Sequence, residues 1–438
     1  MIVHLAYGKT GLNIDVPEGR TTVVEPRFQP ALPDAQGALR QALATPIGSR
    51  ALRDLVGAQD TVGIVISDLT RPMPTADVVR GIISELPQTP VRNITVFVGL
   101  GTHRKMTDEE VASVLGDLAG TYTVSQTDCT DSAAFTTLGR SQAGAPIRFV
   151  SAFLNCSVRI VTGLMEPHLF AGVSGGPKGI LPGIASMETI IGNHSPAHLL
   201  HPKAAYGFTH GNPLWEEIHA AALLARPTFL VNVTVNKNKQ ITAVFAGEMD
   251  AAFERGARFV RETAMVAVPR QYDVVVTTNS GYPLDLNFYQ AVKGMTAAAP
   301  ILKPGGAMIV AAECWDGIPY GSRMEAILRK VKTPEEIIEG IEDGPYAGMD
   351  QWQLLLYAQI LQKATVHLKT SRLSAEDVRA CLAVPCDDVG ATLRMVLDRY
   401  GPNSTACILP EGPQTVPYIA GTWRRIGNQP VDRSQPGP

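Results

Sequence analysis

Residues 158–179, VRIVTGLMEPHLFAGVSGGPKG, contain the two features that decide the fold. The stretch begins with VRIVTGLM, an apolar run that predicts a buried strand of the parallel type. A loop follows that is rich in glycine, carries Lys178 and has His168 near its start. Glycine allows tight turns and a close approach of the backbone to a ligand, so core packing alone does not explain this loop.

The same order of strand, polar loop and helix occurs twice upstream of this stretch. TVGIVISD (61–68) and NITVFVGLG (93–101) are predicted strands. Helical spacing follows over 76–86, and a second helix is predicted after Thr107, the candidate N-cap, with Glu110 at the capping-box spacing. Alternating strands and helices predict a parallel sheet, and such sheets bind ligands beyond the carboxyl ends of their strands.

A second α/β unit is predicted from Tyr272 onward. It comprises a strand at 272–280, a loop and helix at 281–302, a turn at KPGG (303–306) and a strand at 307–314. The boundary is placed near 266–271, after a long helical stretch. We therefore predict an α/β fold of two domains, 1–268 and 269–425, with parallel or mixed sheets flanked by helices. A loose tail is predicted at 426–438, and the active site in the cleft between the domains.

Composition narrows the class of partner. The chain has 438 residues, 45% hydrophobic and 18% charged, with a net charge of −3, which favours neither nucleic acid nor a membrane surface. The amino terminus resembles a strand, a turn and a strand rather than a signal peptide, and no apolar run is long enough to span a membrane. The six cysteines are scattered without CxxC spacing, which predicts reduced thiols in a cytoplasmic enzyme that acts on a small molecule.

Polar side chains follow four of the predicted strands. Each has a structural alternative: Asp68 could cap a helix, Arg71 could be a surface charge, and a lone loop histidine is more often structural. The recurrence of histidine, arginine and lysine at successive strand ends nevertheless indicates a site there. The residues are Asp68, Thr70 and Arg71; Thr102 and His103; Glu166, His168 and Lys178; and Asn279 and Ser280, with Tyr289, Gln290 and Lys293 on the next helix.

Two common motifs are only partly matched. SGGPKG (174–179) resembles a phosphate-binding loop, but it fits neither G-x-x-x-x-G-K-[ST] nor G-x-G-x-x-G. His194, His198 and His201 are spaced H-x3-H-x2-H, and the first two could share a helix face and bind zinc. Pro196 lies between them and no glutamate follows His194, which argues against a zinc protease.

Taken together, these segments resemble the nickel-pincer-nucleotide-dependent lactate racemase family. The resemblance rests on DLTRP (68–72), GTHR (101–104), EPHLFAGVSGGPKGILPG (166–183), NH (193–194) and YQAVKGM (289–295). Their order and spacing fit the family across most of both domains.

The resemblance implies a role for each residue. Lys178 would hold the cofactor, a pyridinium mononucleotide, through a thioamide. Nickel would be bound by two sulfurs and one carbon of that cofactor and by His194, while His103 and His168 would be the acid/base pair. Enzymes of cofactor synthesis would be partners. The remaining cofactor contacts would be Asp68, Thr70, Gly175 and Gly176, and the substrate contacts Arg71, Tyr289, Gln290, Lys293 and Trp352.

These residue types suit the inversion of a 2-hydroxy acid. Removing hydride from C2 to an electron-poor ring leaves a planar 2-keto acid, to which hydride can return on either face. Two bases are needed, because each enantiomer presents its hydroxyl on a different side, and histidine titrates near working pH. The substrate stays open among lactate, malate, longer or aromatic hydroxy acids and aldonates. A cofactor carrier, a nucleotide-dependent dehydrogenase and a zinc hydrolase are the alternatives.

Overall fold

The computed structural model describes residues 1–342, 344–348 and 351–421, and the predicted tail at 426–438 lies outside them. The chain forms two compact units: unit 2 is Phe28–Thr263, and unit 1 joins Met1–Arg27 to the chain from Ala264 onward. The division near 264 lies close to the predicted boundary. The first 27 residues, however, belong to unit 1 with the carboxyl-terminal part of the chain, and not to unit 2 as predicted.

Unit 2 is built on a mixed six-stranded sheet of order β13-β12-β9-β4-β5-β6, in which only β13 is antiparallel to its neighbour. Its strands are β4 (Val62–Ser67), β5 (Ile94–Gly99), β6 (Thr123–Gln126), β9 (Val158–Leu164), β12 (Phe229–Val235) and β13 (Ile241–Gly247). Two hairpins accompany it, β7 (Phe135–Arg140) with β8 (Pro146–Val150), and β10 (Pro167–His168) with β11 (Gly172–Val173).

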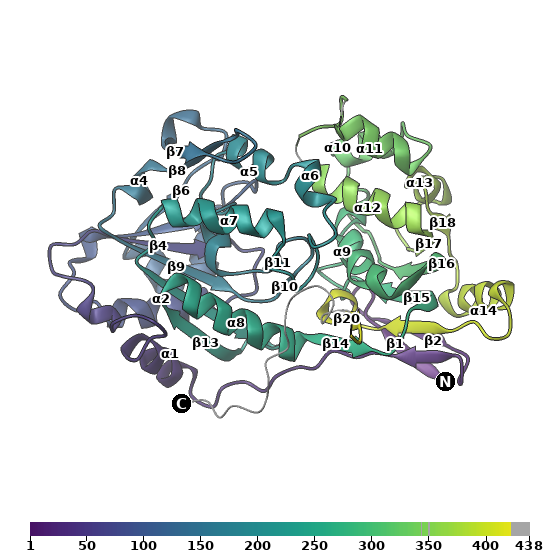
Figure 1. The fold of residues 1–438 in the computed structure, drawn as a ribbon. Coiled ribbons are helices and arrows are strands. Elements are labelled where there is room, and N and C mark those ends of the chain that lie inside the picture. The colour runs from purple at the N-terminus through teal and green to yellow at the C-terminus, as the bar shows by residue number, and fades with distance from the viewer. Residues whose placement is uncertain (343, 349–350, 422–438) are drawn as a thin grey trace. The chain divides into compact units, whose positions relative to one another are not determined.

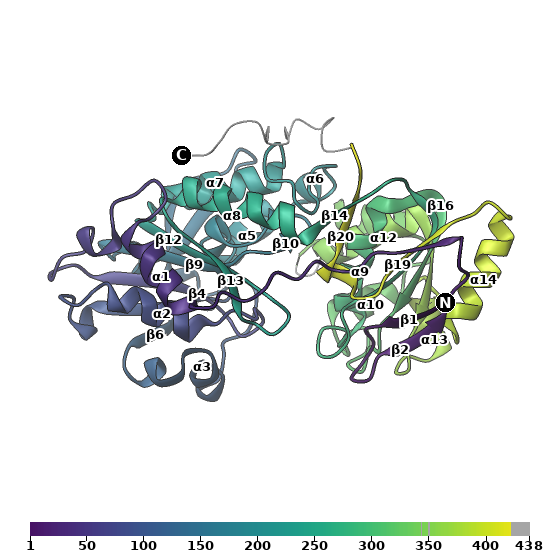
Figure 2. The ribbon, with the colours of Figure 1, turned by 90° about the horizontal axis from the view of Figure 1, so that it is seen from below.

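Helices α1 and α2 cover one face of this sheet, where they lie side by side (Figure 2). Leu39 and Leu43 of α1 and Val78 of α2 share one apolar core with Ile64 and Ile66 of β4. The predicted capping box is confirmed, since Thr107 caps α3 and pairs reciprocally with Glu110. The helices are α1 (Ala35–Ala44), α2 (Thr75–Ser84), α3 (Asp108–Leu115), α4 (Ser151–Leu154), α5 (Met187–Asn193), α6 (Pro196–Leu199), α7 (Pro213–Leu224) and α8 (Met249–Ala264).

Unit 1 is built on a parallel sheet of order β18-β17-β16-β15-β19-β3. Its strands are β3 (Thr21–Val23), β15 (Tyr272–Thr278), β16 (Leu302–Ala311), β17 (Ala364–Lys369), β18 (Val384–Pro385) and β19 (Ala406–Leu409). Its other strands are β1 (Ile2–Leu5), β2 (Leu12–Asp15), β14 (Met265–Val268) and β20 (Val416–Ile419).

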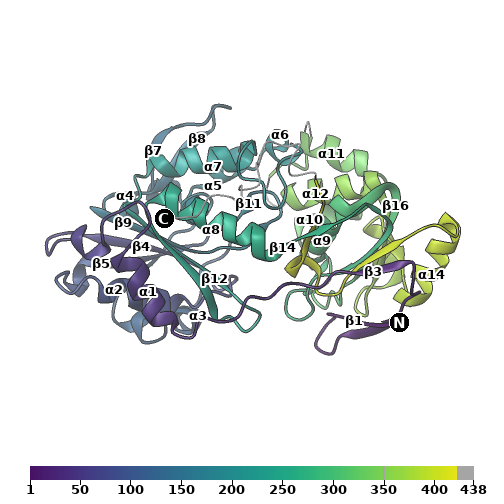
Figure 3. The same cartoon turned by 60° about the horizontal axis from the view of Figure 1, so that its bottom comes forward.

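The two faces of this sheet pack against different elements. One face, with Val274 and Ile309, shares a core with Leu393 of α14 and with Leu5 and Ile14 of the β1–β2 hairpin. Successive strand residues face opposite ways, so α9 and α12 contact the other face (Figures 1 and 3). The helices are α9 (Phe288–Ala298), α10 (Arg323–Leu328), α11 (Pro334–Glu342), α12 (Gln351–Lys363), α13 (Ala375–Ala380) and α14 (Val389–Tyr400).

Two details differ from the sequence prediction. The amino-terminal segment joins unit 1 because β3 pairs with β19; an apolar pattern predicts a strand but does not identify its partner. The prediction of a turn at KPGG was also wrong, because residues 303–306 lie within β16. They form a bulge between the paired residues Tyr272–Leu302 and Val274–Ala307. Gly305 supports the bulge with a φ of +75°.

Within the described residues, no helix is both long and apolar enough to cross a membrane.

Candidate active site

The predicted residues of unit 2 gather at one edge of its sheet. Strands β9, β4 and β5 are neighbours and run parallel, so their carboxyl ends meet at the same edge. Asp68 directly follows β4, His103 follows β5 by a short loop, and His168 follows β9. The sequence prediction that these three strand ends lie together is therefore confirmed.

Asp68 and His103 form a close pair. The His103 Nδ1 atom lies 2.7 Å from Oδ2 of Asp68, and the Thr70 hydroxyl donates to Oδ1 at 2.7 Å. A carboxylate can only accept, so Nδ1 carries the hydrogen and the neutral His103 ring keeps its lone pair on Nε2. The helix-cap alternative for Asp68 is wrong, because α2 begins at Thr75 after Pro74.

The charge of Asp68 is stabilised by its neighbours although the side chain is buried. Burial raises the pKa of the carboxyl, but the hydrogen bond and charge of His103, the Thr70 hydroxyl and the charge of Arg71 together bring the pKa below its usual value. A cavity of about 250 Å³ opens beside this pair. It is lined by Asp68, Leu69, Thr70, His103, Arg104 and Met106.

Arg71 pairs with Glu166 rather than standing alone at the surface. Its Nη1 lies 3.5 Å from the Glu166 Oε1, and both side chains keep more than a third of their exposure, 36% and 40%. Such exposed pairs contribute about 0–1 kcal/mol. An incoming carboxylate could therefore compete with Glu166 for the guanidinium at little cost.

His168 sits in the β10–β11 hairpin, which turns back immediately after β9. Its ring is buried, and Nδ1 accepts a hydrogen bond from the Ala171 N–H at 3.2 Å. The Phe170 and His168 rings pack in a T-shaped arrangement with centroids 4.6 Å apart. His168 is thus held by its own hairpin, with a backbone partner where His103 has a carboxylate.

Lys178 lies in the short helix η5 (Gly176–Gly179), which the glycine loop leads into. Gly175 and Gly176 have φ values of +80° and +54°, and at Gly163 and Gly175 the backbones of β9 and the loop come too close for a side chain. Burial lowers the pKa of Lys178 to about 7, and the charge of Arg71 adds to the effect. A large part of this lysine is therefore uncharged, and nucleophilic, at neutral pH.

His194 ends helix α5 and is buried. Its Nδ1 lies 3.0 Å from the Ile190 carbonyl, so Nδ1 donates and Nε2 keeps a lone pair that could bind a metal. Burial, followed by the charge of Lys178, lowers its pKa to about 3, although the Ile190 carbonyl acts in the opposite direction. His198 belongs to the separate helix α6, so the two histidines do not share one helix face. Among the described residues, no group of three or more His, Cys, Asp or Glu side chains could hold a metal ion.

The predicted substrate residues of unit 1 lie on α9 and α12. The Trp352 Nε1 donates to the Tyr289 hydroxyl at 2.9 Å, and the Gln353 amide donates to the Tyr289 carbonyl at 2.6 Å. Gln290 and Lys293 follow Tyr289 on α9, whose first turn is capped by Asn287. Within unit 1, α9 and α12 therefore bring Tyr289 and Trp352 together.

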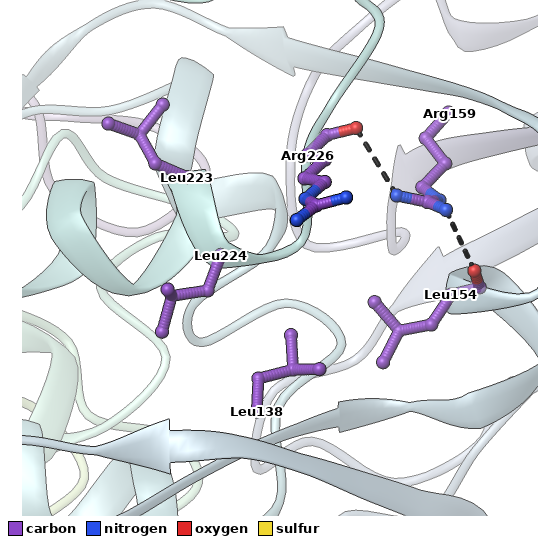
Figure 4. Close-up of a pocket in the computed structure, with 6 residues that line it drawn as sticks. All are labelled: Leu138, Leu154, Arg159, Leu223, Leu224 and Arg226. Carbon is purple, nitrogen blue, oxygen red and sulfur yellow. Dashed lines mark hydrogen bonds between the residues drawn. The ribbon is translucent and has the colours of Figure 1, made fainter.

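A larger cavity of unit 2, about 400 Å³, is formed by different residues (Figure 4). The Arg159 guanidinium at this cavity donates to the carbonyls of Leu154 at 2.9 Å and Arg226 at 3.4 Å, so it serves the fold. None of the residues that line this cavity has a side chain that could act as an acid, a base or a nucleophile near pH 7. The lining consists of Leu138, Leu154, Arg159, Leu223, Leu224 and Arg226.

Comparison with known proteins identifies the family to which the chain belongs. The family model of the lactate racemase N-terminal domain matches residues 7–207, and that of the C-terminal domain matches residues 266–416. The chain belongs to the lactate racemase family. Family membership makes it an isomerase of the racemase class, and it confirms the family resemblance, the α/β fold and the two-domain organisation.

Individual relatives cover most of the chain. The lactate racemase of Thermoanaerobacterium thermosaccharolyticum is 31% identical over 94% of this chain and 97% of its own. That of Lactiplantibacillus plantarum is 35% identical over 74% of this chain and 77% of its own. The structure of the T. thermosaccharolyticum lactate racemase apoprotein superposes with a TM-score of 0.88 at 30% identity, covering 95% of this chain and 100% of that one. A Thermotoga maritima protein shares the fold, with a TM-score of 0.66 at 18% identity over 90% of this chain and 100% of that one.

Sequence reasoning missed the residues that support the site. Phe170 lies within the quoted glycine-rich stretch, yet an aromatic residue there is indistinguishable from ordinary core. Asn212 is completely buried and donates to the Phe170 carbonyl at 2.8 Å, although it is distant in sequence. No sequence signal identified Asn212, because its partner is a backbone carbonyl.

Proposed function

We propose that this racemase inverts C2 of a 2-hydroxy acid, using a nickel-pincer nucleotide bound covalently to Lys178. The observation that carries the proposal is the set of groups at the unit 2 edge. A lysine of lowered pKa, a buried neutral histidine and two further histidines lie around the ends of three neighbouring strands. The lysine suits covalent attachment of a cofactor, the buried histidine suits a metal ligand, and the two further histidines suit two proton transfers.

The residues present fit the cofactor. An uncharged Lys178 amine can form the thioamide link, and the His194 Nε2 can act as a metal ligand because Nδ1 is engaged by Ile190. Asp68, Thr70, Gly175 and Gly176 are the further cofactor contacts that we propose. When bound, the nickel-pincer nucleotide supplies an electron-poor acceptor for the hydride of C2.

Two histidines handle the hydroxyl proton. Asp68 holds the His103 ring so that Nε2 is free to accept a proton, and the carboxylate stabilises the imidazolium that results. We assign the matching step for the opposite enantiomer to His168. Its Nδ1 accepts from the Ala171 N–H, so the neutral ring carries its hydrogen on Nε2 and takes up a second proton only when that hydrogen bond opens. One base for each enantiomer is required because the two hydroxyl groups point to different sides.

The substrate carboxylate needs a cationic partner. We assign this role to Arg71, whose exposed pairing with Glu166 is weak, and the guanidinium geometry suits a bidentate contact. Tyr289, Gln290, Lys293 and Trp352 are proposed as further substrate contacts on the strength of the family resemblance. The two relatives named above are lactate racemases, which makes lactate the first substrate to try.

Location and partners follow from the same proposal. All six cysteines are free and buried, which supports a reducing, cytoplasmic location. The enzymes that assemble the cofactor are the proposed protein partners.

A racemisation assay tests this function. The chain is co-expressed with cofactor-synthesis enzymes. Single enantiomers of lactate, malate and an aromatic 2-hydroxy acid, and single C2 epimers of an aldonate, are followed by chiral chromatography. The two C2 stereoisomers of the true substrate should converge on the same mixture. Loaded enzyme that leaves every acid unchanged would favour a cofactor carrier, and oxidation that depends on added NAD would favour a dehydrogenase.

A further inference from the structure

One aromatic ring touches three of the proposed functional groups. The Phe170 ring forms T-shaped pairs with His168, with centroids 4.6 Å apart at 74°, and with His194, with centroids 5.1 Å apart at 83°. The Lys178 Nζ lies 5.7 Å from the centre of the same ring. The ring therefore contacts a proposed acid/base, a proposed metal ligand and the proposed point of cofactor attachment.

The backbone of Phe170 is fixed from both sides. Its carbonyl accepts from the completely buried Asn212 side chain at 2.8 Å, and the next strand of the hairpin is held by the Gly207 N–H, which donates to the Gly172 carbonyl at 2.8 Å. Gly172 has a φ of +79° and lies directly on the Phe208 backbone, so a side chain there would displace the loop. The 205–212 segment thus holds the hairpin that presents Phe170.

The ring can neither titrate nor donate a conventional hydrogen bond. Its side chain is buried, with 6% exposure, and both ring contacts are edge-to-face, the arrangement that aromatic pairs prefer. Close packing resists displacement of neighbours, so a rigid ring that touches three groups sets the distances among them.

We propose that Phe170 is a positioning residue that fixes His168 relative to Lys178 and His194. The catalytic meaning of this arrangement rests on the proposed function, whereas the arrangement itself does not. A displacement of about 1 Å between reacting groups can cost roughly 10²-fold in rate. Leucine has a smaller, flexible side chain, so Phe170→Leu should let His168 move while leaving the hydrogen bonds of the hairpin intact.

The kinetic experiment uses enzyme co-expressed with cofactor-synthesis enzymes. Phe170→Leu should lower kcat by about 10–10²-fold with KM changed by less than about threefold, and Phe170→Tyr should recover most of the rate. The matched control is Phe153→Leu, which removes a fully buried ring of unit 2 that packs edge-on against Phe97 at 5.4 Å. The control should lower the melting temperature and leave kcat within about twofold.

A second experiment needs neither cofactor nor activity. In apoprotein labelled at histidine, the ring current of Phe170 shifts the imidazole protons of His168 and His194. Both sets of resonances should move in Phe170→Leu and stay in place in Phe153→Leu. The resonances of His219 should stay in place in both variants. If Phe170→Leu is poorly folded, Phe170→Met serves for the same measurement.

The two experiments separate the two claims. Unmoved His168 and His194 resonances in Phe170→Leu would overturn the proposed positioning role, and so would an unchanged kcat in loaded enzyme. Moved resonances would show that the Phe170 ring lies against both histidines. If wild-type enzyme then neither loads nor racemises, this packing stands and the proposed function is refuted instead.

Discussion

The carboxyl edges of the two sheets carry similar kinds of side chain and use them differently. In unit 2, Asp68 pairs with the titratable ring of His103. In unit 1, the Oδ2 atom of Asp285 accepts from the backbone N–H groups of Gly8 at 2.8 Å and Glu313 at 3.0 Å. Both carboxylates follow parallel strands and both are buried. A strand-end position therefore brings a polar group to the edge, and its partner decides whether the group is available for chemistry.

The same contrast holds for the smaller polar residues. The Thr70 hydroxyl of unit 2 donates to a carboxylate that also holds a histidine. The Ser280 hydroxyl of unit 1 donates to the Glu411 carbonyl at 2.7 Å, and the Asn279 amide donates to the Leu284 carbonyl. Asn279 and Ser280 thus stabilise loops, although their sequence position resembles that of the unit 2 residues.

The largest expected effect is that of Lys178→Ala in unit 2. This change removes the proposed point of attachment, so racemisation should fall to background because the cofactor carries the hydride chemistry. Chiral assay of co-expressed protein measures this, and Lys237→Ala, an exposed lysine of the same unit, is the control. Activity retained in Lys178→Ala would contradict the proposal that the carboxyl edge of the unit 2 sheet holds the cofactor, which is its main difference from the corresponding edge in unit 1.

His103→Ala and His168→Ala should each lower kcat by about 10²–10⁴-fold, the usual contribution of general acid/base catalysis. A matched control exists on α7 and α8, where His219 Nε2 lies 2.7 Å from Asp250. His219→Ala removes a comparable histidine–carboxylate pair and should keep its activity. Equal losses in all three variants would point to stability rather than to proton transfer.

Asp68→Asn should lower kcat by about 10²-fold, because His103 loses the charge that orients its ring. The carboxyl pKa is lowered in the folded protein, so the ionised form stabilises the fold above its unfolded pKa of about 3.9. That contribution is lost as the pH falls through the folded pKa. Melting temperatures of wild type and Asp68→Asn should therefore differ at pH 7 and converge below about pH 4; a constant gap contradicts this account.

Asp285→Ala should act on stability instead. It leaves two part-buried backbone donors without their acceptor, at about 1–3 kcal/mol each, so the free energy of unfolding should fall by about 2–6 kcal/mol. Urea denaturation measures the loss, and Asp285→Asn, which keeps one acceptor oxygen, should lose less. A folded, loaded Asp285→Ala enzyme should retain its kcat, and a large drop would show that this edge also takes part in chemistry.

The smallest expected effect is that of Ser280→Ala, about 1 kcal/mol for one hydrogen bond to the backbone. Ser280 also has a φ of +63°, which glycine adopts without strain. Ser280→Gly should therefore be less destabilising than Ser280→Ala in thermal melts. The reverse order would mean that backbone strain at this residue is unimportant.

The sequence predicted the elements well because their signals are local. The apolar strands at 61–68 and 158–165 and the Thr107 capping box depend on neighbours in the chain, and the structure has all three. The place of β3 in the sheet of unit 1 depends on its partner β19, almost 400 residues away, which periodicity does not encode.

The candidate site was predictable to a similar degree. Its charged residues follow strands, so fold logic placed them at one edge. Their partners were not predictable, since Glu166 for Arg71 and Ala171 for His168 depend on how the loop after β9 folds. Phe170 and Asn212 were missed because apolar packing and bonds to the backbone have no signature in one sequence.

The most direct test of the central claim is the intact mass and nickel content of wild-type protein co-expressed with cofactor-synthesis enzymes. We expect an added mass of nucleotide size, mapped to the peptide that contains Lys178, together with about one nickel per chain as the single metal ligated by His194. An unmodified chain without nickel, from cells in which the synthesis enzymes load a known lactate racemase, would contradict the account.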